Sequence, residues 1–148
     1  VWGASQLWTG PLSDRVGRKW PSVAGFFLCA AGVGGFPFLG SVAGWGAAAA
    51  VTGVGMALLY PTLIAAMSDI AHPSWRGSAL GVYRFWRDLG YAVGALAMGL
   101  IADASGALEA GFLFVAVAMG GSGLWLWYAM EETHPRLNPA PETEPANV

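Results

Sequence analysis

Charged residues are scarce in this sequence. Asp, Glu, Lys and Arg together make up 11% of the 148 residues, whereas hydrophobic residues make up 55%. Soluble domains carry about 25% charged residues, and a soluble chain of this length could not bury so much apolar surface. The scarcity of charge therefore excludes an ordinary water-soluble domain and predicts an integral membrane protein, with the lipid bilayer as its surroundings.

Cysteine is rare, and positive charge is not in excess. Cys29 is the single cysteine, which excludes an internal disulfide, and we expect it to be a small buried apolar side chain. The formal net charge of −2 excludes the basic field that nucleic-acid binding requires. We expect no nucleic-acid partner, no metal site and no cofactor.

Long uncharged stretches divide the chain into candidate helices. A bilayer span needs about 20 consecutive apolar residues, and backbone groups in lipid must be paired within the segment, so helices are the expected form. The uncharged stretch between Lys19 and Asp69 is long enough for two spans. The sequence therefore predicts an all-α, multi-span helical bundle with about four full transmembrane helices, at residues 20–40, 45–67, 79–102 and 109–130.

The two ends of the sequence differ from these spans. Residues 1–13 are uncharged but would cover only about 20 Å as a helix, against a hydrocarbon core of about 30 Å. We interpret them as the inner end of one truncated span, which makes residues 1–130 the transmembrane region. Residues 131–148 are polar and rich in proline, which predicts a disordered tail.

Basic residues are distributed unequally between the two predicted sides of the membrane. When the loops are assigned alternately, all of them fall on one side or in the first turns of a helix that leaves it: Arg15, Arg18, Lys19, Arg76, Arg84, Arg87 and Arg136. By the positive-inside rule this side is cytoplasmic. We therefore expect a protein of the cell (inner) membrane with its C-terminus in the cytoplasm.

The first basic loop carries a motif. Residues 10–19 read Gly-Pro-Leu-Ser-Asp-Arg-Val-Gly-Arg-Lys, which resembles the loop signature of the major facilitator superfamily. The matching positions are Gly10, Leu12, Ser13, Asp14, Arg15, Gly17, Arg18 and Lys19. Glycines permit tight turns, and an acid here can pair with Arg15 or Arg18 or meet a helix N-terminus. A plain basic loop beside the membrane is the alternative interpretation.

Two further segments support the same resemblance. Residues 61–103, with an Arg76-Gly77 pair that opens a glycine-rich helix, are similar to the tenth and eleventh helices of that superfamily. Residues 131–136 are more weakly similar to a signature that follows the sixth and twelfth helices. The resemblance implies a partial fold of this family, from the end of the eighth helix to the twelfth, which pairs with an N-terminal half of the same protein.

Charges inside a predicted span are costly and therefore informative, at roughly 2.5–3.5 kcal/mol each near the centre. Arg84 and Asp88 are four residues apart on a helix and can form a local interfacial pair. The alternative is a cytoplasmic gate made by Arg76, Arg84, Arg87 and Asp88, which the resemblance extends to the Asp14 loop and to Glu131 or Glu132. We expect no charge near the middle of the bilayer.

Small and polar residues give further candidates. Gly90, Gly94 and Gly99 place small residues along one helix, which permits close helix packing. Pro37 and Pro61 are expected to kink their helices. Polar or soft side chains that could face a solute cavity are Gln6, Met56, Tyr60 and Tyr91.

The function implied by the resemblance is secondary active transport of a small solute by alternating access. Two six-helix halves would rock around a site near the middle of the membrane. Proton coupling, substrate and direction stay open. The alternatives are a non-transporting sensor or assembly subunit of the same fold and an intramembrane enzyme. Residues 120–123 superficially suggest the enzyme, but His72 and His134 lie outside the spans, so we expect no catalytic residue.

Overall fold

Helices account for most of residues 1–134 and 137, which are the residues that the computed structural model describes. The elements are α1 (Trp2–Val16), α2 (Lys19–Gly35), the short 3-10 helix η1 (Phe36–Phe38), α3 (Val42–Ile70), α4 (Arg76–Ser105) and α5 (Leu108–Ala129). Within the described residues there is no strand. The predicted all-α bundle is confirmed, and each predicted span corresponds to one helix.

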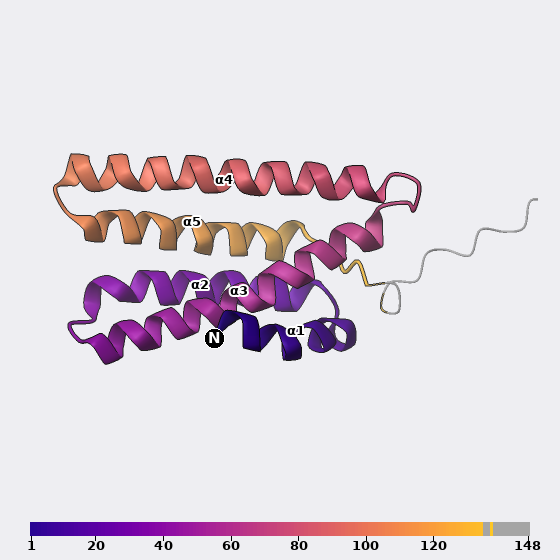
Figure 1. Cartoon of the computed structure of the whole chain (residues 1–148), viewed down its shortest axis with the longest axis horizontal. Coiled ribbons are helices and arrows are strands. Elements are labelled where there is room, and N and C mark those ends of the chain that lie inside the picture. The colour runs from indigo at the N-terminus through magenta and orange to yellow at the C-terminus, as the bar shows by residue number, and fades with distance from the viewer. Residues whose placement is uncertain (135–136, 138–148) are drawn as a thin grey trace, which may run out of the picture.

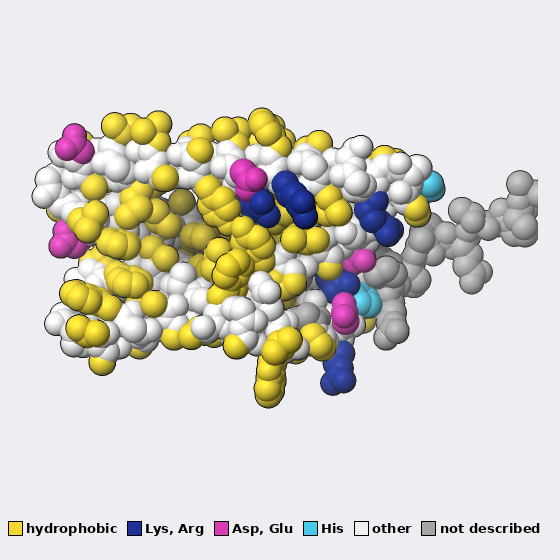
Figure 2. Space-filling model, viewed as in Figure 1, with side chains coloured by type: hydrophobic (Ala, Val, Ile, Leu, Met, Phe, Trp, Pro, Cys, Tyr) yellow, Lys and Arg dark blue, Asp and Glu magenta, His cyan; other side chains and the backbone are white. Residues whose placement is uncertain are grey.

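The helices run lengthwise with their connections at two ends (Figure 1). The α1–α2 and α3–α4 connections and the segment after α5 lie at one end, which we call the basic end. The connections from η1 to α3 and from α4 to α5 lie at the other. Figure 2 shows Lys and Arg side chains toward the basic end and acidic side chains at the opposite end. The alternation of loops that the charges predicted is therefore present in the structure.

Three of the helices are long and apolar enough to cross a membrane: α2 with η1, α3 and α5. The fourth expected span, α4, has 30 residues and is about 45 Å long, which exceeds a hydrocarbon core of about 30 Å. It falls outside the apolar group because its first half carries Arg84, Arg87 and Asp88. Length therefore supports a span at α4, and charge makes that helix different from the others.

Local sequence signals mark the ends of the helices. Ser41 precedes α3, and its hydroxyl accepts a hydrogen bond from the Gly44 N–H at 3.1 Å, as an N-cap does. Gly106 follows α4 with φ of 65°, a left-handed conformation that favours glycine. Pro37 was expected to kink its helix, but α2 ends at Gly35 and Pro37 lies in η1. Pro61 lies inside α3.

Small residues form the contact between α2 and α3. A Cβ added at Gly55 would lie 2.7 Å from the Cys29 Sγ and 2.8 Å from the Gly25 carbonyl oxygen. A Cβ at Gly32 would collide with the Thr52 hydroxyl and lie 2.8 Å from the Ala48 carbonyl oxygen. Cys29 is fully buried in this contact, as expected. Membrane helices associate through such close backbone approach because lipid offers no hydrophobic driving force between them.

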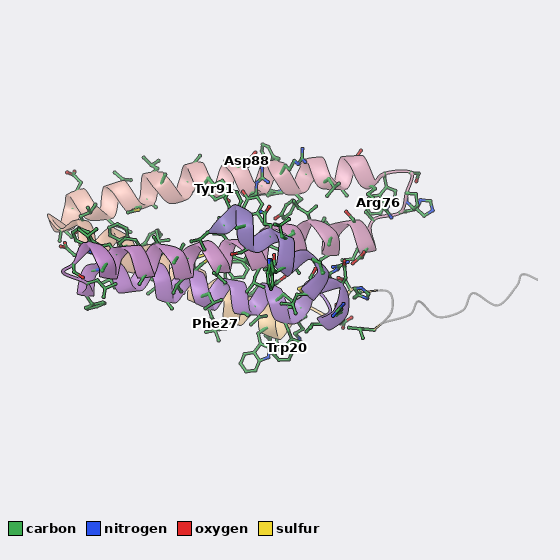
Figure 3. All side chains as sticks on the ribbon, turned by 60° about the horizontal axis from the view of Figure 1, so that its bottom comes forward. Trp20, Phe27, Arg76, Asp88 and Tyr91 are labelled. Carbon is green, nitrogen blue, oxygen red and sulfur yellow. The ribbon has the colours of Figure 1, made fainter. Side chains whose placement is uncertain are left out.

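Large apolar side chains lie on the outside of the bundle. Trp8, Phe38 and Val42 are each more than three-quarters exposed, and Trp20 and Phe27 point away from the helices in Figure 3. The largest fully buried side chains are Thr62, Cys29, Ser13 and Ser22. This is the reverse of a soluble core, in which large apolar residues are buried. The arrangement fits a molecule surrounded by lipid.

The close α2–α3 contact gives a stability prediction. We expect Gly55→Ala to lower the thermal stability of the detergent-purified protein by about 1–3 kcal/mol, because the new methyl group meets backbone atoms that cannot move aside. Gly46→Ala is the matched control on the same helix, since a Cβ there meets nothing within 4 Å. Equal melting temperatures for the two variants would contradict the packing described here.

Candidate functional site

The connection between α1 and α2 consists of two residues, Gly17 and Arg18. Gly17 has φ of 100°, and its N–H donates to the Ser13 carbonyl oxygen at 3.1 Å, which ends α1. A Cβ at this position would collide with the carboxylate of Glu132. The backbone conformation therefore requires glycine at the position that the loop motif predicted, and a larger residue would also displace the Glu132 carboxylate.

Arg18 is buried, with 7% of its surface exposed, although it carries a charge. Its Nε donates to the Asp69 Oδ2 at 2.9 Å, and its guanidinium also donates to the Asp14 Oδ1 and the Ser13 Oγ, both at 2.8 Å. Burial opposes the charge, but hydrogen bonds to Asp69 and Asp14 raise the pKa of Arg18 above its ordinary value. A buried charge that lost these partners would be strongly destabilising.

Glu132, just after α5, lies at the N-terminus of α2. Its carboxylate accepts the backbone N–H of Arg18 at 2.7 Å, of Lys19 at 3.2 Å and of His134 at 2.9 Å. The first N–H groups of a helix lack partners within the helix, and its positive dipole end favours an acid. Burial raises the pKa of Glu132, yet the backbone donors outweigh it and the net direction is downward from 4.5.

These contacts join three distant parts of the chain at the basic end. We call Ser13, Asp14, Arg18, Asp69 and Glu132 the Arg18 cluster. They come from the end of α1, the loop after it, the end of α3 and the segment after α5. The cluster therefore links the ends of α1 and α3, the start of α2 and the segment after α5 at the basic end.

The predicted loop and gate residues have different places relative to this cluster. Asp14, Gly17 and Arg18 belong to it directly, and Lys19 contributes its backbone N–H. Arg15 and Glu131 are exposed and take no part in the three ion pairs among the described residues. Gly10 lies within α1.

Asp69 was not foreseen in this role, whereas the resemblance had implied that Glu131 or Glu132 joins the Asp14 loop, and Glu132 lies there. In the sequence Asp69 borders an uncharged stretch, and an acid at the end of a span that meets a basic loop is a recognisable signal. Residues 131–134 were expected to be disordered, but Glu132 holds them against α2, and His134 is buried. The rest of the predicted tail lies outside the described residues, except Leu137.

A second cluster lies between α1, α3 and α4. The hydroxyls of Tyr60 and Tyr91 are 2.7 Å apart, and the Arg87 guanidinium lies 5.3 Å from the centre of the Tyr60 ring. The Arg87 Nε donates to the Asp88 Oδ1 at 2.8 Å, and Trp2 packs edge-on against Tyr60 at 5.5 Å. We call Trp2, Tyr60, Arg87, Asp88 and Tyr91 the Tyr60 cluster. It combines a cation over a ring, a carboxylate and two hydroxyls.

The α4 residues of the Tyr60 cluster lie near the middle of that helix. Asp88 follows Arg76 by 12 residues, or about 18 Å along a helix, and if α4 is centred on a core of about 30 Å this puts Asp88 about 10 Å inside. Figure 3 shows Asp88 and Tyr91 near the middle of α4 and Arg76 at its start. Among the described residues Asp88 pairs with Arg87, at 2.7 Å, and not with Arg84.

The remaining candidates are spread over the bundle. Met56 lines a pocket of about 300 Å³ together with Trp2, whereas Gln6 is exposed on α1. Arg76 and Arg84 are exposed on α4. A Cβ at Gly90, Gly94 or Gly99 would meet nothing within 4 Å, so no packing partner of these glycines lies among the described residues. A larger pocket of about 650 Å³ near the basic end is lined by residues that include Met67, Tyr83, Met130 and Glu131.

Groups that could support enzyme or metal chemistry are separated. Among residues 1–134 and 137, no three His, Cys, Asp or Glu side chains could together hold a metal ion. The His72 ring bonds to the Ser74 hydroxyl at 2.8 Å within the α3–α4 loop. Ser122 lies in α5, and the sequence alone had suggested it as part of an enzyme site.

Comparison with known proteins gives one match. The family model described as Major Facilitator Superfamily matches residues 2–147 of this chain. Neither the curated proteins nor the solved structures give a match. The matched region covers nearly the whole chain and includes both clusters.

Glu132 gives a prediction about pH. Because its folded pKa lies below 4.5, the stability that it contributes is present above pH 4.5 and is lost as the pH falls through the folded value. We expect Glu132→Gln to lower stability at pH 7 by about 1 kcal/mol and to remove this acid dependence. Melting curves between pH 7 and acid measure both effects. Glu131→Gln is the control, and an equal effect of the two variants would refute the capping role.

Proposed function

This chain belongs to the major facilitator superfamily, and we propose that it forms part of a secondary transporter that moves a small solute across a membrane by alternating access. Members of this family are transporters, and the match extends over residues 2–147. Three long apolar helices and an exterior of large apolar side chains support an integral membrane protein. Substrate, direction and coupling ion are open within this proposal, and proton coupling is one option.

We propose that the protein lies in the cell (inner) membrane. The basic end then faces the cytoplasm. The α1–α2 loop, the α3–α4 loop and the segment after α5 all lie at that end, and it carries the excess of Lys and Arg that cytoplasmic loops have. We also propose that the chain is part of the C-terminal half of the transporter, from the end of the eighth helix to the twelfth. An N-terminal half would then supply the other wall of the solute cavity.

The Arg18 cluster is the proposed fixed point of the cytoplasmic gate. The observation that supports this proposal is the buried side chain of Arg18. Its guanidinium donates to Asp69 of α3 and Asp14 of α1, and the backbone N–H of Arg18 donates to Glu132. These charges stabilise one arrangement of α1, α2 and α3 at the basic end. A change between inward-facing and outward-facing states must either move this group as a unit or break charge-assisted hydrogen bonds, each of which costs about 1.5–3 kcal/mol.

The Tyr60 cluster is the proposed solute site in this half. Tyr60, Arg87, Asp88 and Tyr91 bring hydrogen-bond donors, acceptors and both signs of charge together where α3 meets α4. Ionisable groups at this depth are expensive, and in membrane proteins they mark solute or ion pathways. Arg87 and Asp88 retain 24% and 62% exposure of their side chains, so a solute can reach them.

The gate proposal predicts the effect of Asp69. We expect Asp69→Asn to lower the transport rate by about tenfold or more, because it leaves Arg18 buried with one of its two acidic partners missing. The assay is solute flux into liposomes that contain the full-length protein, with the solute chosen from a labelled panel. Asp103→Asn, at the opposite end of α4, should change the rate by less than about twofold.

Two results would count against this proposal. A wild-type rate of solute flux in Asp69→Asn, at equal protein levels, would refute the proposal that the Arg18 cluster acts in the gate. Absence of flux for every solute, with wild-type protein that is folded, would favour the alternative of a non-transporting sensor or assembly subunit.

The solute-site proposal predicts the effect of Tyr91. We expect Tyr91→Phe to raise the KM of transport by about threefold to tenfold, because it removes the hydroxyl that bonds to Tyr60. Tyr128→Phe is the matched control, since that side chain is 88% exposed near the end of α5. An unchanged KM in Tyr91→Phe would place the solute elsewhere.

A further inference from the structure

Pro61 interrupts the hydrogen-bond ladder of α3. Proline has no backbone N–H, so the carbonyl oxygen four residues earlier, at Ala57, loses its partner within the helix. Ala57 is fully buried, which excludes water as a replacement. In a membrane protein such a carbonyl must find a donor from a neighbouring helix or side chain.

Thr9 of α1 supplies this donor. Its hydroxyl Oγ1 donates to the Ala57 carbonyl oxygen at 2.8 Å, although the two residues are 48 positions apart in the sequence. Thr9 is itself 7% exposed. Three other hydroxyls of the chain, those of Ser22, Thr52 and Ser68, bond instead to the carbonyl four residues earlier in their own helix or its first turn. The Thr9 hydroxyl therefore bonds to another helix, and it does so at the carbonyl that lacks a backbone donor because residue 61 is proline.

The broken turn lies directly beside the proposed solute site. Tyr60 immediately precedes Pro61, and its hydroxyl lies 2.7 Å from that of Tyr91 on α4. On the other side Tyr60 meets Trp2, which stands seven residues, or about two helical turns, before Thr9. One face of α1 thus touches α3 both at the ring of Tyr60 and at the carbonyl that Pro61 releases.

We propose that Thr9 is a positioning residue for the solute site, which acts through the proline break in α3. Its hydrogen bond to Ala57 fixes the path of α3 at Pro61, and this path directs the Tyr60 hydroxyl toward Tyr91 and sets the Tyr60 ring beneath the Arg87 guanidinium. The inference rests on the proposed transport function. It adds Thr9, which does not contact the Tyr60 hydroxyl itself, to the residues that set affinity for the solute.

The same face of α1 also reaches the basic end. Ser13 is four residues after Thr9, one turn further along the helix, and its hydroxyl belongs to the Arg18 cluster. Thr9 therefore lies between the two clusters on a single helical face. A shift of α1 at the basic end would therefore strain the Thr9–Ala57 hydrogen bond and change the position of Tyr60.

Three variants of the full-length protein test this role. Thr9→Val removes the hydroxyl and keeps the side-chain shape, whereas Thr9→Ser keeps the hydroxyl. The third is Thr9→Val combined with Pro61→Ala, in which the restored N–H at position 61 can serve Ala57 without Thr9. We expect Thr9→Val to raise the KM of transport about fivefold, and Thr9→Ser to stay within about twofold of wild type. In the Pro61→Ala background, Thr9→Val should change KM no further.

A spectroscopic measurement separates positioning from general stability and does not require flux. With 3-fluorotyrosine incorporated, the 19F resonance of Tyr60 is assigned from its loss in Tyr60→Phe. We expect this resonance to shift in Thr9→Val but not in Thr9→Ser, and to be insensitive to Thr9→Val when residue 61 is Ala. If wild-type protein transports nothing, the proposed function fails, while the 19F shift still decides the role of Thr9.

The inference is overturned by either of two results. One is a folded Thr9→Val protein with the wild-type Tyr60 resonance and wild-type KM. The other is an effect of Thr9→Val that is equally large with Ala at position 61, since the hydroxyl would then act independently of the proline break. If Thr9→Val alone does not fold, the Pro61→Ala pair, compared with and without Thr9→Val, makes the same decision.

Discussion

The buried charge of Arg18 is the constraint on which the basic end of this molecule depends. A guanidinium with 7% exposure is tolerable only if its donors meet acceptors, and here Asp14, Ser13 and Asp69 provide them. This requirement fixes the two-residue loop after α1 and brings the end of α3 beside it. The same turn exposes the first N–H groups of α2, which Glu132 then caps from the segment after α5.

Away from that end, small residues and hydroxyls hold the helices together. Gly25, Gly32 and Gly55 let α2 and α3 approach until their backbones nearly touch. By contrast, Ala79 is the single buried residue of α4, which packs mainly on α5 and only lightly on α3. The proposed solute site thus spans a firmly packed helix, α3, and a loosely held one, α4. Such a boundary is where relative motion costs least.

The sequence alone predicted the fold well, because the pattern of charge and apolar length reports directly on the membrane. It placed each span within a few residues and identified the loop that contains Gly17 and Arg18. It did not identify Asp69 or Thr9, since their roles depend on a contact between helices far apart in the chain. Helical spacing suggested Arg84 as a partner of Asp88, whereas the structure pairs Asp88 with Arg87. Spacing along one helix shows which side chains can pair but not which of them do.

The distance between the end of α1 and the end of α3 tests the central claim most directly. Spin labels at Val16 and Ile70, which are 45% and 64% exposed, report this distance in the full-length protein. The Arg18 cluster predicts one narrow distance distribution, which broadens or shifts when Arg18→Gln removes the bonds to Asp69 and Asp14. The same narrow distribution in wild type and Arg18→Gln would contradict the account, since the two helix ends would then be held by something else.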